Sequence, residues 1–311
     1  MSLTNNNFRL MQAITSNNRE DIVRWALESL KEDKTQKNER WVKNYIEKLT
    51  EASNNIYEVP YNLKGFISME QPRDTFLVER YYSTAKDEEM LNKILNMHQV
   101  GMQLEEMKIP YNNTTILYGP SGTGKTTFGR YIAYKLEMPF IYLNFSQVVD
   151  SYMGSTSKNL SKIFDFVKSV PCVFMLDEID CISIKRSGTD GSGASEELAR
   201  ITVSLMQELD RLSNNHIILA ATNRLDRMDE AILRRFSVRY YMDVPTTENK
   251  REMIKKYINS LYVYNESFQE FMNDNYINSV VEKSKTQADV INNIVVSVAD
   301  FILQENTINK V

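Results

Sequence analysis

The segment Thr114-Thr-Ile-Leu-Tyr-Gly-Pro-Ser-Gly-Thr-Gly-Lys-Thr126 decides the fold. Its first residues form a short β-branched run, which is typical of a buried strand. From Gly119 onwards the residues fit the pattern G-x-x-x-x-G-K-[ST], in which glycines let consecutive backbone N–H groups turn towards an anion. The pattern predicts a phosphate-binding loop that leads into a helix, whose positive N-terminal end faces the phosphates.

The loop residues differ in their expected roles. Lys125 should reach the β- and γ-phosphates, and the Thr126 hydroxyl should take a coordination position of Mg²⁺. The pattern alone indicates phosphate binding, since kinases and GTPases share it, and a chance match in a Gly-rich turn is the plain alternative. A strand before the loop and a helix after it favour the functional interpretation. The residues expected to contact the nucleotide are Gly119, Pro120, Ser121, Gly122, Thr123, Gly124, Lys125, Thr126 and Thr127.

Strand-like and helix-like segments alternate after this loop. Further strands are expected at residues 140–145, 173–176, 217–222 and 238–244, and helices at 158–170, 196–212 and 229–236. This alternation predicts an α/β fold whose core is a five-stranded parallel sheet with helices on both faces. The strand patterns end at Pro245, and helical patterns at residues 247–261 and 286–304 predict a small C-terminal helical domain.

The N-terminal part of the chain carries no chemical motif. Apolar residues at helical spacing predict two amphipathic helices at residues 19–31 and 39–49, and residues 54–74 are expected to form an extended connector. The expected organisation is therefore an N-terminal helical segment at residues 1–78, a nucleotide-binding core at 79–245 and a helical domain at 246–311.

Two carboxylates and an amide follow predicted strands. Asp177 and Glu178 end the apolar run at residues 173–176, which places them at the carboxyl edge of the sheet, where α/β folds bind ligands. Asp177 is expected to hold Mg²⁺ through water, and Glu178 to act as the general base on the attacking water. Asp180 is expected to be structural. Asn223 follows the next strand, where its amide could orient that water or sense the γ-phosphate, and a turn asparagine is the alternative.

Composition narrows the classes of function. The chain has 311 residues, a formal net charge of -4, two cysteines and two histidines. The negative charge provides no global basic field for nucleic acid, and so few Cys and His residues do not make a recognised zinc site. Cys172 and Cys181 are expected to be reduced thiols. Neither a signal peptide nor a membrane-spanning run is apparent, so the expected location is the cytoplasm.

Taken together, four motifs resemble those of AAA+ ATPases. GPSGTGKT begins at Gly119, VFMLDEID at Val173, AATN at Ala220 and DEAILRRF at Asp229. More narrowly they resemble the AAA subfamily proper, with a segment near the arginines that is similar to katanin and spastin. The resemblance implies ATP and Mg²⁺ as ligands, a helical lid after the core, and a homo-hexameric ring with ATP between subunits.

The same resemblance assigns residues outside the nucleotide loop. Arg234 and Arg235 would be arginine fingers that reach the γ-phosphate of a neighbouring subunit, which suits an always-charged planar guanidinium. A basic helix end is the alternative. Tyr152, Met153 and Gly154 would form a pore loop that grips an extended polypeptide, and residues 187–200 a second one. The alternative for Tyr152 is packing on its own subunit.

The chain also departs from the family pattern. Thr286-Gln-Ala-Asp289 stands where Ser-Gly-Ala-Asp is usual, and residues 1–85 match none of the family's common N-terminal domains. Residues 1–78 are therefore expected to bind an unidentified protein substrate or adaptor. The leading hypothesis is an ATP-driven remodelling, unfolding or disassembly motor for protein substrates. The alternatives are a regulatory ATPase partner of a separately encoded enzyme such as a protease, as among small bacterial AAA ATPases, and a nucleic-acid-associated ATPase.

Overall fold

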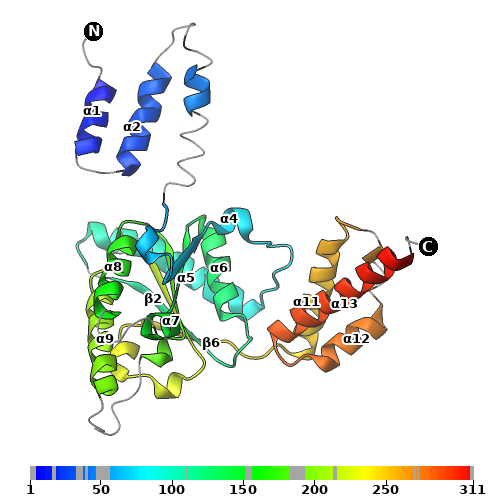
Figure 1. Ribbon diagram of the computed structural model, residues 1–311. Coiled ribbons are helices and arrows are strands. Elements are labelled where there is room, and N and C mark those ends of the chain that lie inside the picture. The colour runs from blue at the N-terminus through cyan, green and yellow to red at the C-terminus, as the bar shows by residue number, and fades with distance from the viewer. Residues whose placement is uncertain are drawn as a thin grey trace. The chain divides into compact units, whose positions relative to one another are not determined.

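The protein divides into two units by its internal contacts, Met1–Glu58 and Val59–Val311 (Figure 1). The structure, a computed structural model, describes residues 5–15, 19–32, 38, 41–46, 57–109, 111–150, 156–182, 193–212, 216–265, 267–268, 271 and 273–308. The first unit ends upstream of the boundary expected at residue 78. The reason is that residues 67–70, within the segment expected to be N-terminal, form a strand in the sheet of the second unit.

The first unit contains a pair of packed helices, α1 (Asn5–Thr15) and α2 (Arg19–Glu32). The helix predicted at residues 19–31 is confirmed as α2, and residues 41–46 of the predicted helix 39–49 are helical. Helix α1 was not predicted, because it opens with three asparagines of low helix propensity. Its side chains Phe8, Met11 and Ile14 are exposed at a spacing of three residues, which places them on one face.

The second unit is built on a sheet that has six strands among the described residues, in the order β1-β3-β4-β5-β2-β6. Its strands are β1 (Ile67–Glu70), β2 (Asn113–Tyr118), β3 (Phe140–Asn144), β4 (Val173–Asp177), β5 (Ile217–Thr222) and β6 (Val238–Tyr241). The last five pair in parallel, which confirms the predicted α/β class and those five strands.

Strand β1 is the correction to the predicted five-stranded sheet. It pairs antiparallel with β3, although its residues lie in the predicted extended connector. Four residues are too few to show a periodicity, so the pairing with β3, far along the chain, decides that this segment is a strand. Glu70 of β1 also forms an ion pair with Arg130, which fixes β1 to the helix after the nucleotide loop.

Helices cover both faces of the sheet (Figure 1). The core on one face joins alternate strand residues such as Val173 and Met175 to α5 (Ala85–Glu106) and α6 (Lys125–Leu136). On the other face Phe174 packs edge-on against Phe164, at 5.3 Å between ring centroids. The helices α8 (Thr156–Lys168) and α9 (Gly193–Leu209) pack against each other, and the short elements are α4 (Pro72–Thr75), α7 (Phe145–Asp150) and α10 (Glu230–Leu233).

The helical lid follows β6 and comprises α11 (Thr247–Leu261), α12 (Asp274–Lys283) and α13 (Gln287–Ile308). The first and last were predicted, and α12 was not. The apolar core of the lid includes Ile254, Ile258, Ile277, Val290 and Ile294. None of the helices in the described part of the chain has the length and apolarity needed to cross a membrane.

Candidate active site

Three neighbouring strands bring the predicted site together. In the sheet β5 lies between β2 and β4, and all three run in parallel. The carboxyl ends of parallel strands meet at one edge of a sheet. The nucleotide loop follows β2, Asp177 ends β4, and Asn223 follows β5, so residues far apart in the sequence line one pocket.

The loop backbone needs its glycines. Gly119, Gly122 and Gly124 have φ angles of 143°, 77° and 88°, a range that L-residues with a side chain rarely adopt. A Cβ on Gly119 would lie 2.1 Å from the carbonyl oxygen of Met242. The loop therefore takes a shape that this sequence pattern permits, and Gly124 leads directly into Lys125, the first residue of α6.

Lys125 is buried at the centre of this arrangement, with 8% of its surface exposed. Its Nζ donates to the carbonyl oxygens of Gly119 at 2.9 Å and Pro120 at 2.8 Å, and to Oδ1 of Asn223 at 2.7 Å. Burial lowers the pKa of Lys125, while the charges of Asp177 and Asp180 act in the opposite direction. The ammonium group is held by neutral acceptors that a phosphate oxygen could replace.

The carboxylates have separate surroundings. The Thr126 hydroxyl donates to Oδ2 of Asp177 at 2.9 Å, and the Glu178 backbone N–H donates to Oδ1 of the same carboxylate at 2.9 Å. Glu178 is exposed, and its φ of 55° is left-handed. Asp180 accepts from the Thr222 hydroxyl at 2.7 Å, which links the ends of β4 and β5 and agrees with a structural role.

The donor set fits Mg²⁺ in the presence of phosphate. Thr126 and Asp177 offer adjacent hydroxyl and carboxylate oxygens, the ligand type that Mg²⁺ prefers. Within the described ranges no group of three or more His, Cys, Asp or Glu side chains could hold a metal ion. Mg²⁺ commonly uses one or two protein oxygens together with substrate phosphates and water.

The pocket around these residues has a volume of about 310 Å³. Residues of the lid form one side of it: Gln287, Ala288 and Ile291. The rest is formed by Ser121, Gly122, Gly124, Lys125, Thr126, Thr127, Asp177, Glu178 and Asn223. The structure therefore brings the predicted loop, acidic pair and Asn223 into one cavity and adds the lid, which sequence reasoning did not place there.

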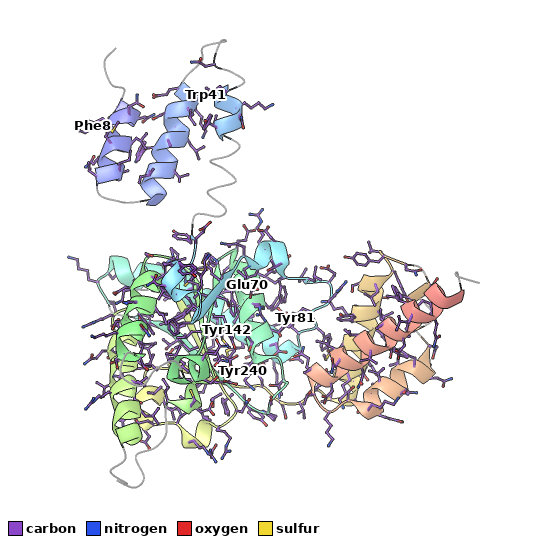
Figure 2. All side chains as sticks on the ribbon, in the orientation of Figure 1. Phe8, Trp41, Glu70, Tyr81, Tyr142 and Tyr240 are labelled. Atoms are coloured by element: carbon purple, nitrogen blue, oxygen red, sulfur yellow. The ribbon has the colours of Figure 1, made fainter. Side chains whose placement is uncertain are left out.

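A second pocket of about 420 Å³ was not predicted. Its lining combines aromatic and apolar residues with polar and charged ones, and Tyr81 and Tyr240, labelled in Figure 2, are part of it. Thr123 of the loop also borders it, so it opens beside the nucleotide loop. A planar heterocyclic base suits such a lining. No sequence signal could have found this pocket, because its residues come from segments far apart in the chain: residues 81–87, the nucleotide loop, residues 240–246, α11 and the first residue of α13.

The two candidate arginine fingers differ in their contacts. Arg235 makes a two-pronged ion pair with Asp210, with Nε and Nη2 at 3.1 Å and 3.0 Å from the carboxylate oxygens, and donates to the carbonyl oxygen of Ala231. The Arg234 side chain is 78% exposed and pairs with Glu230 at 3.5 Å. Neither lines the two pockets of its own chain.

The other predicted site residues are not located by the structure. Tyr152, Met153 and Gly154 lie outside the described residues. Of the second predicted pore-loop region, residues 187–200, the structure describes 193–200 as the start of α9. The pore-loop roles therefore stay predictions.

Comparison with known proteins agrees with this architecture. The family described as "ATPase family associated with various cellular activities (AAA)" matches residues 115–244, from β2 to just beyond β6. A 26S proteasome regulatory subunit 8 homolog of Schizosaccharomyces pombe is 32% identical over 50% of this chain and 40% of its own length. The proteasome-activating nucleotidase of Methanocella arvoryzae is 37% identical over 45% of this chain and 34% of its own length.

A further relative matches more of both chains. The uncharacterized AAA family ATPase y4kL of Sinorhizobium fredii is 27% identical over 76% of this chain and 73% of its own length. By contrast, the chain spans less than half the length of the two proteasomal relatives. The likeness to those two is thus confined to part of each protein, and the subfamily is left unspecified. Residues 115–244 are therefore identified as a domain of the AAA ATPase family.

Proposed function

We propose that this chain binds Mg·ATP across the two pockets and hydrolyses it. The observation that carries the proposal is the cluster at the carboxyl edge of the sheet: buried Lys125 beside the Thr126–Asp177 pair, within a glycine-shaped loop. A cation, a hydroxyl and a carboxylate so placed match the requirements for binding and cleaving a phosphoanhydride. The aromatic pocket next to Thr123 would take the adenine.

Each residue has a separate task in this mechanism. Lys125 exchanges its contacts with Gly119, Pro120 and Asn223 for β- and γ-phosphate oxygens, which neutralises charge as the bond to the leaving group breaks. Mg²⁺, when bound, supplies further neutralisation of the phosphates. Thr126 and Asp177 are the residues that would hold it.

Glu178 and Asn223 would act on the attacking water. Glu178 borders the pocket of about 310 Å³ around Lys125, which we call the phosphate pocket. Its side chain is exposed to solvent, so a water molecule can approach the carboxylate. The carboxylate takes a proton from this water as the water oxygen attacks the γ-phosphorus. Asn223, once Lys125 has turned to the phosphates, has an amide free to orient the same water.

A second chain would complete the site. We infer a hexameric ring in which Arg234 is the principal finger, because its guanidinium is exposed, whereas Arg235 is held by Asp210. The driven process is remodelling of a protein substrate. Support comes from the resemblance of Tyr152–Gly154 to a pore loop and from relatives named as proteasome regulators. Residues 1–78, with the exposed apolar face of α1, would bind a substrate or adaptor.

The test is a Glu178→Gln variant of the full chain. ATP turnover, measured by phosphate release, should fall by roughly 10²–10⁴-fold, while ATP affinity, measured by calorimetry with Mg²⁺, should stay within about threefold of the wild type. Glu282→Gln makes the same chemical change on the exposed surface of α12 and should alter neither quantity. Undiminished turnover in the Glu178 variant would remove Glu178 from the base role.

A further inference from the structure

Gln287 occupies a special place between the two pockets. Among the described residues it is the only one that lines both the phosphate pocket and the aromatic pocket. Its side-chain oxygen Oε1 lies 1.9 Å from the point that a Cβ on Gly124 would occupy. The Gln287 amide therefore lies directly against the loop backbone, next to Lys125.

The lid segment that carries Gln287 is fixed on the nucleotide loop. The backbone N–H of Ala288 donates to the carbonyl oxygen of Gly122 at 3.0 Å. Thr286 and Asp289 form a reciprocal cap at the start of α13: Oδ2 of Asp289 accepts from the Thr286 N–H at 2.9 Å, and Oγ1 of Thr286 accepts from the Asp289 N–H at 3.2 Å. The cap holds the first turn of α13, and with it the Gln287 Cα, in a defined position.

A nucleotide that fills both pockets must pass this amide. With the base beside Tyr240 and the terminal phosphates beside Lys125, the ribose and the α-phosphate lie in between. A glutamine offers two N–H donors and one carbonyl acceptor, which suit phosphate oxygens and ribose hydroxyls. The glycine that is usual at this position has no side chain with which to make such a contact.

We propose that Gln287 is a nucleotide-contacting residue of the lid, with its amide directed at the ribose and α-phosphate of the ATP bound under the proposed function. The contact would connect α13 to the ligand directly. The N-terminal end of α13 faces the same region, so its dipole also favours the phosphate charge. Nucleotide binding would thereby add a lid contact to the hydrogen bond that Ala288 already makes to the loop.

The test is a charge series at position 287, measured as Mg·ATP affinity of the full chain by calorimetry. Gln287→Glu places a negative charge against the phosphates and should weaken binding by roughly tenfold or more. Gln287→Lys should bind at least as tightly as Gln287→Ala, because its charge attracts the phosphates. The matched controls are Asn292→Asp and Asn292→Lys on the exposed side of the same helix, and they should leave the affinity within about twofold.

The sign of the effect distinguishes a contact from a structural role. If Gln287 had only a structural role, Gln287→Glu and Gln287→Lys would both bind Mg·ATP more weakly, and both variants would have a lowered melting temperature. Equal losses, or a Glu variant that binds like the wild type, would overturn the inference while leaving the proposed function intact. The proposed function fails separately, if the wild-type chain does not bind Mg·ATP or if Lys125→Ala binds it with unchanged affinity.

Discussion

Replacing Gly119 with alanine should destabilise the ATPase unit through a defined backbone clash. The new Cβ would lie 2.1 Å from the carbonyl oxygen of Met242 and 3.1 Å from its carbonyl carbon. Those atoms belong to backbone, not to a flexible side chain. The Met242 N–H also donates to the carbonyl oxygen of Tyr118 at 2.8 Å, so moving Met242 away disturbs the junction where β2 and β6 end.

The magnitude follows from two costs. A φ of 143° is unfavourable for alanine, and we take the strain as about 1–2 kcal/mol. Displacing packed backbone adds about 1–3 kcal/mol. The sum of about 2–5 kcal/mol corresponds to a fall in melting temperature of at least about 4 °C for a unit of this size.

The assay is thermal unfolding without nucleotide, followed by circular dichroism. The matched control is Gly65→Ala, because a Cβ at Gly65 meets no atom within 4 Å. That variant should be neutral or stabilised by about 0.4–1 kcal/mol, since alanine restricts the unfolded chain more than glycine does. A Gly119→Ala protein that melts within about 2 °C of the wild type would refute the reasoning.

Three further predictions concern the finger, the lid cap and a buried thiol. Arg234→Ala should keep ATP affinity but lower the turnover of the assembled protein by at least about 10³-fold in phosphate-release assays; unchanged turnover would exclude Arg234 as the finger. Hydrogen bonds from the backbone N–H groups of Thr286 and Lys285 lower the pKa of Asp289 below its usual 3.8. The ionised carboxylate therefore stabilises the folded lid above pH 3.8, and this stabilisation is lost as the pH falls through the lowered pKa. Asp289→Asn should thus lower the stability measured by urea unfolding at pH 7, and the difference from the wild type should shrink progressively in acid. Burial raises the pKa of the Cys172 thiol, so iodoacetamide at pH 8 should modify half-buried Cys181 first and Cys172 only on unfolding, as peptide mass mapping would show.

The sequence by itself predicted the features that depend on local pattern. The glycine-rich loop between a strand and a helix, the acidic pair after an apolar run and the parallel strands all follow from residue types a few positions apart. Lys125, Thr126, Asp177 and Asn223 could be named in this way, because the carboxyl ends of parallel strands share one edge of the sheet. The chemical roles of these residues remain predictions.

Only the tertiary structure decided the features that join distant segments. Strand β1 forms because it pairs with β3. The Arg235 guanidinium is held in an ion pair because Asp210 lies beside it in the folded chain. The aromatic pocket and the place of Gln287 against Gly124 arise where the lid packs on the core. No local pattern encodes these contacts, since each depends on how separately formed elements bury their apolar faces against one another. For that reason the residues around the nucleotide loop could be predicted from the sequence, whereas the second pocket and the lid residues beside the loop could not.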